Sequence, residues 1–168
     1  APAERTIGAP ASDEPAAALV ESLTAMTTPT TDAVPAAPAR DDAGGTAAAE
    51  AATEQLVQAV RDTLSDWARA WAAQNVDDYL AFYDSAFEPS SGLSRAHWEI
   101  QRRTRVTGPD FIEVRLDDLD VDLLDADHAS VVFSQHYRSD SYRDVVRKTM
   151  TLVRDGAAWK ITSETALD

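Results

Sequence analysis

The chain has 168 residues, carries a formal net charge of −14 and contains no cysteine. This length allows one ordinary domain, and the lack of thiols excludes disulfides, zinc–thiolate sites and a cysteine nucleophile. The negative charge argues against binding to nucleic acids or anionic lipid surfaces, and no apolar run approaches the ~18 residues of a membrane span. We therefore expect neither a nucleic-acid partner nor a membrane span.

Residues 1–52 differ in composition from the rest of the chain. Residues 1–50 contain six of the eight prolines and no aromatic residue. Such a segment buries too little apolar surface to offset the entropy lost on folding. We interpret 1–52 as a disordered, Ala/Pro/Thr-rich acidic tether, in which only 15–26 has the pattern of a transient helix or docking peptide, and 53–168 as the domain. The tether, and a chain that starts at Ala1, predict an exported protein of the periplasm or cell envelope.

Three helices are predicted after the tether. From Glu54 to Trp71, apolar residues recur at spacings of three and four, as on one side of an amphipathic helix. A short second helix is predicted at 76–84. Ser94 is a suitable N-cap for a third helix, which we expect to end before Pro109.

After Pro109 the hydrophobic period changes to two, which indicates β-strands. The apolar positions of 111–116 and 119–123 are out of phase, which predicts one long strand bent by a β-bulge near Asp117-Asp118. Two-residue turns at Asp140-Ser141 and Asp155-Gly156 predict two hairpins. Both turns place the same apolar set on one face of the sheet: Val131, Phe133, Val146, Met150, Leu152, Trp159 and Ile161. We predict an α+β fold, in which three N-terminal helices pack in the concave face of a curved, four-stranded antiparallel sheet.

The same registers predict which polar side chains face the concave side. The candidate ligand-binding residues are Gln135, Tyr137, Tyr142, Lys148 and Ser163 on the strands and Tyr83 on the second helix. They could line a pocket for an anionic or hydroxyl-rich ligand, such as a cell-wall carboxylate or a sugar. The alternative is structural, with Lys148 extending to the open end and Tyr137 bonding a backbone group.

Other residues of chemical interest are assigned to the outer face of the sheet. His136, in the polar run "HYRSDSY", has the parity of that face. Glu164 is predicted there as well, opposite Arg147, where an exposed ion pair contributes well under ~1 kcal/mol. The aspartates of 117–127 lack the glycine and glutamate of an EF-hand loop, so we read them as a solvated face.

An acid–base enzyme of this architecture would need a carboxylate of raised pKa inside the cone. Only Asp84 and Asp144 are expected near its mouth, and no nucleophile, base and orienting group occur together. We therefore predict no catalytic residue, no metal site and no cofactor.

The order of these elements resembles the nuclear-transport-factor-two-like fold, also called the SnoaL-like or cone fold. The stretches "FIEVRLDDLDV" and "VVFSQHYRSDSYRDVVRKTMTLVRDGAAWKITSE" resemble the domain found C-terminal to L,D-transpeptidase-type cell-wall enzymes of Gram-negative bacteria. The resemblance covers about 54–166. The transpeptidase catalytic domain itself is absent, since its nucleophile is a cysteine. Relatives of this fold include isomerases, dehydratases and epoxide hydrolases as well as non-catalytic domains, so the fold does not decide the function.

Three functions follow as hypotheses. The first is a non-catalytic accessory domain of an exported bacterial protein that binds a cell-wall fragment, a glycan or a protein partner. The second is a small-molecule isomerase or hydrolase of the SnoaL-like type. The third is a structural module that forms a homodimer through the outer face, where Val132, Val145 and Val153 are expected.

Overall fold

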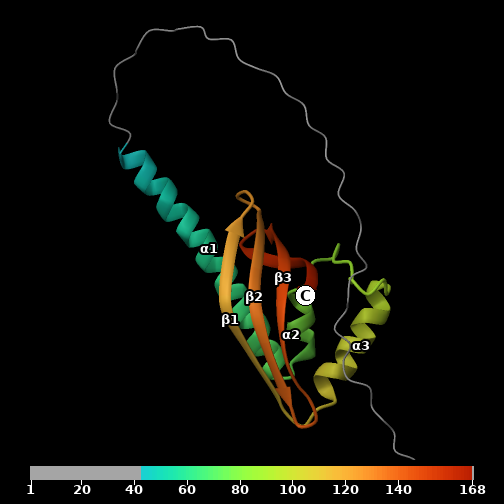
Figure 1. The fold of residues 1–168 in the computed structure, drawn as a ribbon. Coiled ribbons are helices and arrows are strands. Elements are labelled where there is room, and N and C mark those ends of the chain that lie inside the picture. The colour runs from blue at the N-terminus through green and yellow to red at the C-terminus, as the bar shows by residue number, and fades with distance from the viewer. Residues whose placement is uncertain (1–42, 168) are drawn as a thin grey trace, which may run out of the picture.

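The computed structural model describes residues 43–167, and the predicted helical stretch at 15–26 lies outside the described residues. Within the described part there are three helices, α1 (Ala43–Ala72), α2 (Val76–Ala81) and α3 (Arg95–Thr107). They precede four strands, β1 (Ile112–Leu123), β2 (His128–Ser139), β3 (Arg143–Asp155) and β4 (Ala158–Leu167). The strands form one antiparallel sheet in the order β1-β2-β3-β4, with the helices on its concave side (Figure 1). This arrangement confirms the predicted α+β fold.

Helix α1 begins at Ala43, inside the segment that the sequence assigned to the tether. For residues 43–52, the expectation of a disordered tether is therefore corrected. These residues are rich in alanine, which has the highest helix propensity, and they need no apolar partner to be helical. Residues 45–55 are exposed, and this end of α1 projects past the sheet (Figure 1), whereas Val60, Leu64 and Trp67 further along are fully buried. None of the helices in residues 43–167 is long and apolar enough to cross a membrane.

Helices α2 and α3 begin at side-chain caps. The Asn75 side chain accepts a hydrogen bond from the Asp78 amide at the start of α2, and Ser94 accepts one from His97 at the start of α3, as predicted. Helix α2 ends at Ala81 rather than at residue 84, because the next residues bond to β4. The amides of Asp84 and Ile161 donate to the carbonyls of Ile161 and Phe82, at 2.9 and 2.8 Å.

The β1–β2 and β2–β3 pairings agree with the prediction. The register shifts between Asp117 and Asp120, and Asp118 has a left-handed φ of 54°, as expected for a β-bulge at this point. In the β2–β3 hairpin, Phe133 lies opposite Lys148 and Tyr137 lies opposite Asp144.

The predicted β3–β4 register is wrong. The turn residues are Gly156-Ala157, since Asp155 pairs with Ala158. Further along, Leu152 pairs with Ile161 while Thr151 pairs with Ser163, so that Thr162 is an extra residue in β4. A bulge of this kind reverses the alternation of side chains beyond it. It turns Glu164 to the concave face and Ser163 to the convex face.

The core fills the part of the cone between α1, α2 and the middle of the sheet. Trp67 of α1 packs against Tyr79 of α2 and Phe133 of β2, with ring centroids 6.0 and 6.5 Å apart. Met150 and Ile161 on the concave face are fully buried. The wide end of the cone, toward α3 and the β2–β3 turn, is left less filled.

Candidate functional site

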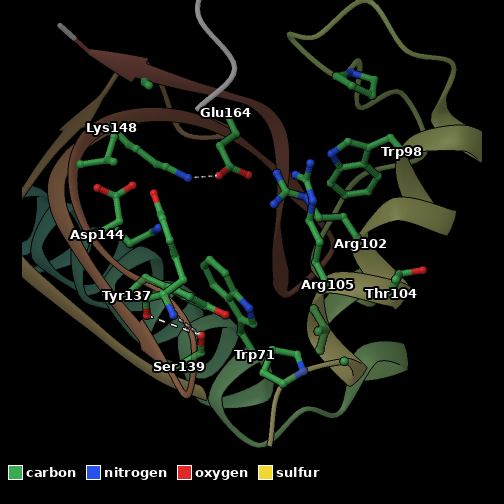
Figure 2. Close-up of a pocket in the computed structure, with 18 of the residues that line it drawn as sticks. Trp71, Trp98, Arg102, Thr104, Arg105, Tyr137, Ser139, Asp144, Lys148 and Glu164 are labelled. Atoms are coloured by element: carbon green, nitrogen blue, oxygen red, sulfur yellow. Dashed lines mark hydrogen bonds and ion pairs between the residues drawn. The ribbon is translucent and has the colours of Figure 1, made fainter. Parts of the chain in front are cut away.

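A cavity of about 620 Å³ opens at the wide end of the cone. It lies between the end of α1, helix α3 and the concave faces of β2, β3 and β4 (Figure 2). Its volume is within the range of small-ligand sites. Its aromatic lining consists of Trp71, Phe87, Trp98, Tyr137 and Tyr142.

The structure places four of the six candidate residues at this cavity: Gln135, Tyr137, Tyr142 and Lys148. Tyr83 does not line the cavity but is buried below it, where its ring packs against Phe87 and Trp98 of the lining and its hydroxyl donates to Glu164. Ser163 lies on the convex face, where its hydroxyl is 2.6 Å from that of Thr151, because the bulge at Thr162 reverses its direction. The part that these residues play in binding stays a prediction.

Glu164 is the main residue that the sequence analysis misplaced. It is 8% exposed and lines the cavity, whereas we expected it on the outer face. Its Oε1 atom lies 2.6 Å from Nζ of Lys148, and its Oε2 atom accepts a hydrogen bond of 2.9 Å from the Tyr83 hydroxyl. Burial by itself would raise the pKa of Glu164, but the charges of Lys148 and Arg102 and these hydrogen bonds lower it to about 2. Glu164 is therefore ionised at neutral pH.

Below the cavity, Glu164 is held by a chain of buried hydrogen bonds. Because the Tyr83 hydroxyl donates to Glu164, it can accept from Nε1 of Trp67 at 3.2 Å and from the Tyr79 hydroxyl at 2.9 Å. Burial raises the pKa of Tyr79 to about 12 and that of Tyr83 well above its usual value, so both phenols stay neutral. The network holds the carboxylate in one orientation toward Lys148.

Helix α3 supplies a basic wall. Arg102 and Arg105 both line the cavity, and Figure 2 shows them on the α3 side, facing Glu164 and the sheet. The guanidinium of Arg102 lies 5.4 Å from the centre of the Trp98 ring. Residues 98, 102 and 105 are spaced by four and three, so one helical face carries all of them. This spacing is the feature of the sequence that could have placed Arg102 and Arg105 at the cavity. Arg103 does not share it, and its guanidinium pairs with Asp77 at 2.7 Å.

Gln135 is the buried polar residue of the cavity wall. It is 6% exposed, and its Oε1 atom accepts no hydrogen bond from any residue in 43–167. A buried polar atom without a partner costs about 1–3 kcal/mol. Because this atom lies at the wall of a cavity, a bound molecule or a water can supply the donor that it lacks.

The acids and histidines do not form an acid–base pair in the cavity. Asp144 lines it, but Asp84 does not, because its carboxylate accepts a hydrogen bond from the Ala86 amide at 2.8 Å. No histidine in the described residues lines the cavity. His136 lies on the convex face and its Nε2 atom is 3.0 Å from Asp117.

The family model of the Cds6 C-terminal NTF2-like domain matches residues 59–165. The chain belongs to this family. The match confirms the predicted resemblance to nuclear-transport-factor-two-like, or NTF2-like, domains. The predicted position behind an L,D-transpeptidase-type domain stays a prediction.

Two longer solved structures are similar to this chain over part of their length. Bd1075 of Bdellovibrio bacteriovorus is similar over 65% of this chain and 39% of its own, with 26% identity and a TM-score of 0.59. A variant of Pgp2, a helical cell shape determining protein of Campylobacter jejuni, matches 61% of this chain and 38% of its own, with 17% identity and a TM-score of 0.57. The chain thus spans about two fifths of each of these relatives.

A candidate dehydratase of the NTF2-like family from Streptomyces avermitilis matches over 67% of this chain and 96% of its own. Its identity is 17% and its TM-score is 0.56. At this identity the likeness, as for Pgp2, shows the fold alone. A comparison with curated proteins found no match.

Proposed function

We propose that this NTF2-like domain is a non-catalytic accessory module of an exported bacterial protein, and that it binds a cell-wall fragment or related glycan in the cavity. One observation carries the proposal. The concave face is hollow at its wide end, and the wall there holds the buried amide of Gln135, whose Oε1 atom has no partner in residues 43–167. Aromatic side chains beside fixed polar groups are the usual composition of a ligand site.

The charged groups of the cavity suit binding better than proton transfer. A carboxylate with a pKa of about 2 is a weak base at neutral pH, and Glu164 is also paired with Lys148. Burial raises the pKa of Tyr137, so its hydroxyl stays a neutral donor or acceptor. Glu164 therefore stays ionised and Tyr137 stays neutral at neutral pH.

The location in the cell envelope is supported by one of the similar structures. Pgp2 is a protein that determines helical cell shape, and its chain contains a domain of this fold. Cell shape depends on the cell wall, so a wall-derived ligand fits the cavity of such a domain. Bd1075 has the same fold over a similar share of its chain, at the higher identity of 26%.

Titration of the chain with soluble peptidoglycan fragments tests this proposal, with calorimetry and the fluorescence of Trp71 and Trp98 as readouts. Gln135→Leu is the informative variant, because it roughly keeps the side-chain volume and removes the Oε1 atom that has no partner in residues 43–167. We expect weaker binding at equal or higher stability toward urea. Val132→Thr, on the convex face, is the matched control and should bind as the wild type does. Failure of the wild-type chain to bind any wall fragment or glycan would contradict the proposal.

The second candidate is a small-molecule isomerase or hydrolase, and Asp144 favours it. This carboxylate lines the cavity, where burial, together with the charge of Asp144, raises the pKa of Tyr142. If the site is catalytic, a compound that binds is converted, and mass spectrometry of the released compound would show a product. Recovery of the unchanged compound supports the binding module.

The third candidate is a homodimer formed through the convex face. Val145 is 59% exposed there, opposite His136 of β2. Light scattering would give twice the mass of one chain, and Val145→Asp would return it to that of a monomer. A monomeric wild-type chain would exclude this candidate.

A further inference from the structure

We infer that the ligand of this cavity is a zwitterion, with a carboxylate that faces α3 and an ammonium that faces β2 and β3. This inference rests on the proposed function, since it presumes that the cavity binds a ligand. It is carried by the distribution of charge on the cavity walls and by the buried amide of Gln135.

The formal charges of the residues that line the cavity sum to zero, but Arg102 and Arg105 lie on a different wall from Asp144. The positively charged residues of the lining are Arg102, Arg105 and Lys148, and its negatively charged residues are Asp140, Asp144 and Glu164. Lys148 and Glu164 form an ion pair of 2.6 Å, and the Glu164 carboxylate also attracts Arg102. Figure 2 shows Asp144 across the cavity from Arg102 and Arg105. A bound molecule therefore lies between a basic wall and an acidic wall.

Gln135 adds a hydrogen-bonding group to the acidic wall. Its partner across the β2–β3 ladder is Val146, so Asp144 lies diagonal to it on the same face of the sheet. Gln135 is 6% exposed, and its Oε1 atom accepts no hydrogen bond from the described residues. The Gln135 amide oxygen and the Asp144 carboxylate are both acceptors, so together they suit a group with several N–H donors.

A singly charged ligand would satisfy only one wall. An anion would place its charge near Arg102 and Arg105 but would bring no positive charge to Asp144. A cation would meet Asp144 but would face the two arginines across the cavity. Repulsion between like charges on the ligand and the wall disfavours binding, so it contributes to selectivity together with the favourable contacts. A zwitterion avoids both costs, and the rings of Trp71 and Tyr137, 5.3 Å apart, can contact its apolar part.

Three forms of one dipeptide test the inference by calorimetry at low salt. They are alanyl-alanine, its N-acetyl form, which lacks the ammonium, and its C-terminal amide, which lacks the carboxylate. Both the L,L and the D,D isomers are used. We expect the zwitterion of at least one isomer to bind about tenfold or more tightly than either blocked form.

Two variants assign each charge to its wall. Arg105→Gln should abolish the preference for the free dipeptide over its amide, and Asp144→Asn should abolish the preference over the N-acetyl form. Arg103→Gln, on the outward side of α3, and Asp120→Asn, on β1, are the matched controls and should keep both preferences. This crossed pattern is a double-mutant cycle between ligand and protein.

Equal binding of all three forms, tighter binding of a blocked form, or binding of none of them would overturn the inference. Soluble peptidoglycan fragments tested in the same experiment separate this failure from that of the proposed function. If the fragments bind and the dipeptides do not, the zwitterion inference is wrong while the proposed binding function stands. If neither binds, both are wrong.

Discussion

The ion pair between Lys148 and Glu164 leads to a quantitative prediction for Lys148→Met. The two side chains are 14% and 7% exposed, so water screens their attraction little. The pKa of Glu164 falls from the usual 4.5 to about 2, and at about 1.4 kcal/mol per pKa unit this corresponds to about 3 kcal/mol of folding free energy, the net result of burial, Lys148, Arg102 and Tyr83. Removal of one partner of a buried pair costs about 3–5 kcal/mol, because the other charge stays buried.

We therefore expect Lys148→Met to lower the free energy of unfolding at pH 7 by about 3 kcal/mol. The corresponding decrease in melting temperature is on the order of 10 °C for a domain of this size. Urea unfolding, followed by tryptophan fluorescence, measures the change. Lys148→Met combined with Glu164→Gln should be more stable than Lys148→Met alone, because no charge is then left buried.

The dependence on pH supplies a second check. Because the pKa of folded Glu164 lies below its usual value, its stabilising effect is present above pH 4.5 and is lost as the pH falls through about 2. The difference between the wild type and Lys148→Met should thus shrink on acidification. Arg138→Met, which removes an exposed pair with Glu113, is the control and should cost less than ~1 kcal/mol. A cost for Lys148→Met as small as that of the control would refute the reasoning.

Three further predictions concern the elements that build the site. Tyr83→Phe removes the donor to Glu164 and should cost about 1–3 kcal/mol in urea unfolding, and an unchanged stability would contradict the hydrogen-bond chain below the cavity. Deletion of Thr162 removes the extra residue of the bulge but leaves Glu164 opposite Met150 on the concave face, so we expect a smaller loss of unfolding free energy than that caused by Lys148→Met; a loss as large as that of Lys148→Met would show that Thr162 itself is needed to position Glu164. Ser94→Ala removes the N-cap of α3 and should cost about 1 kcal/mol, whereas Ser91→Ala, in the preceding loop, should cost almost nothing in the same assay.

The binding proposals also change which variants are informative. Lys148→Ala is a poor test of ligand binding, because the loss of its ion pair destabilises the fold whether or not a ligand binds. Gln135→Leu and Arg105→Gln act on the cavity wall without breaking the pair between Lys148 and Glu164. Effects of these two variants on affinity can therefore be assigned to the cavity.

Much of the architecture could be predicted because the relevant signals are local. Ser94 caps α3 through its own hydroxyl, and the phase change near Asp117 marks the β-bulge of β1. The β2–β3 register follows from a two-residue turn and from alternating side chains, both of which are short-range properties. For the same reason Gln135, Tyr137, Tyr142 and Lys148 were correctly placed on the concave face.

The errors arose where distant contacts decide the geometry. The bulge at Thr162 contains no glycine or other residue that marks a bulge, and it is set by how β4 pairs with β3 and with the segment after α2. One extra residue there moved Glu164 into the cavity and Ser163 out of it. The end of α2 was misplaced for a related reason, because residues 82–84 bond to β4 instead of continuing the helix.

The sequence by itself determined the order of the helices and strands, the caps, the first bulge and the parity of three strands, because each depends on neighbouring residues. The tertiary structure decided that Glu164 neutralises Lys148, that α3 turns Arg102 and Arg105 toward the sheet, and that the wide end of the cone stays hollow. These features depend on the pairing of β4 and on how α3 is held by α2 and by the Gln74 side chain, which donates to the Val106 and Pro109 carbonyls. Local periodicity contains no information on either.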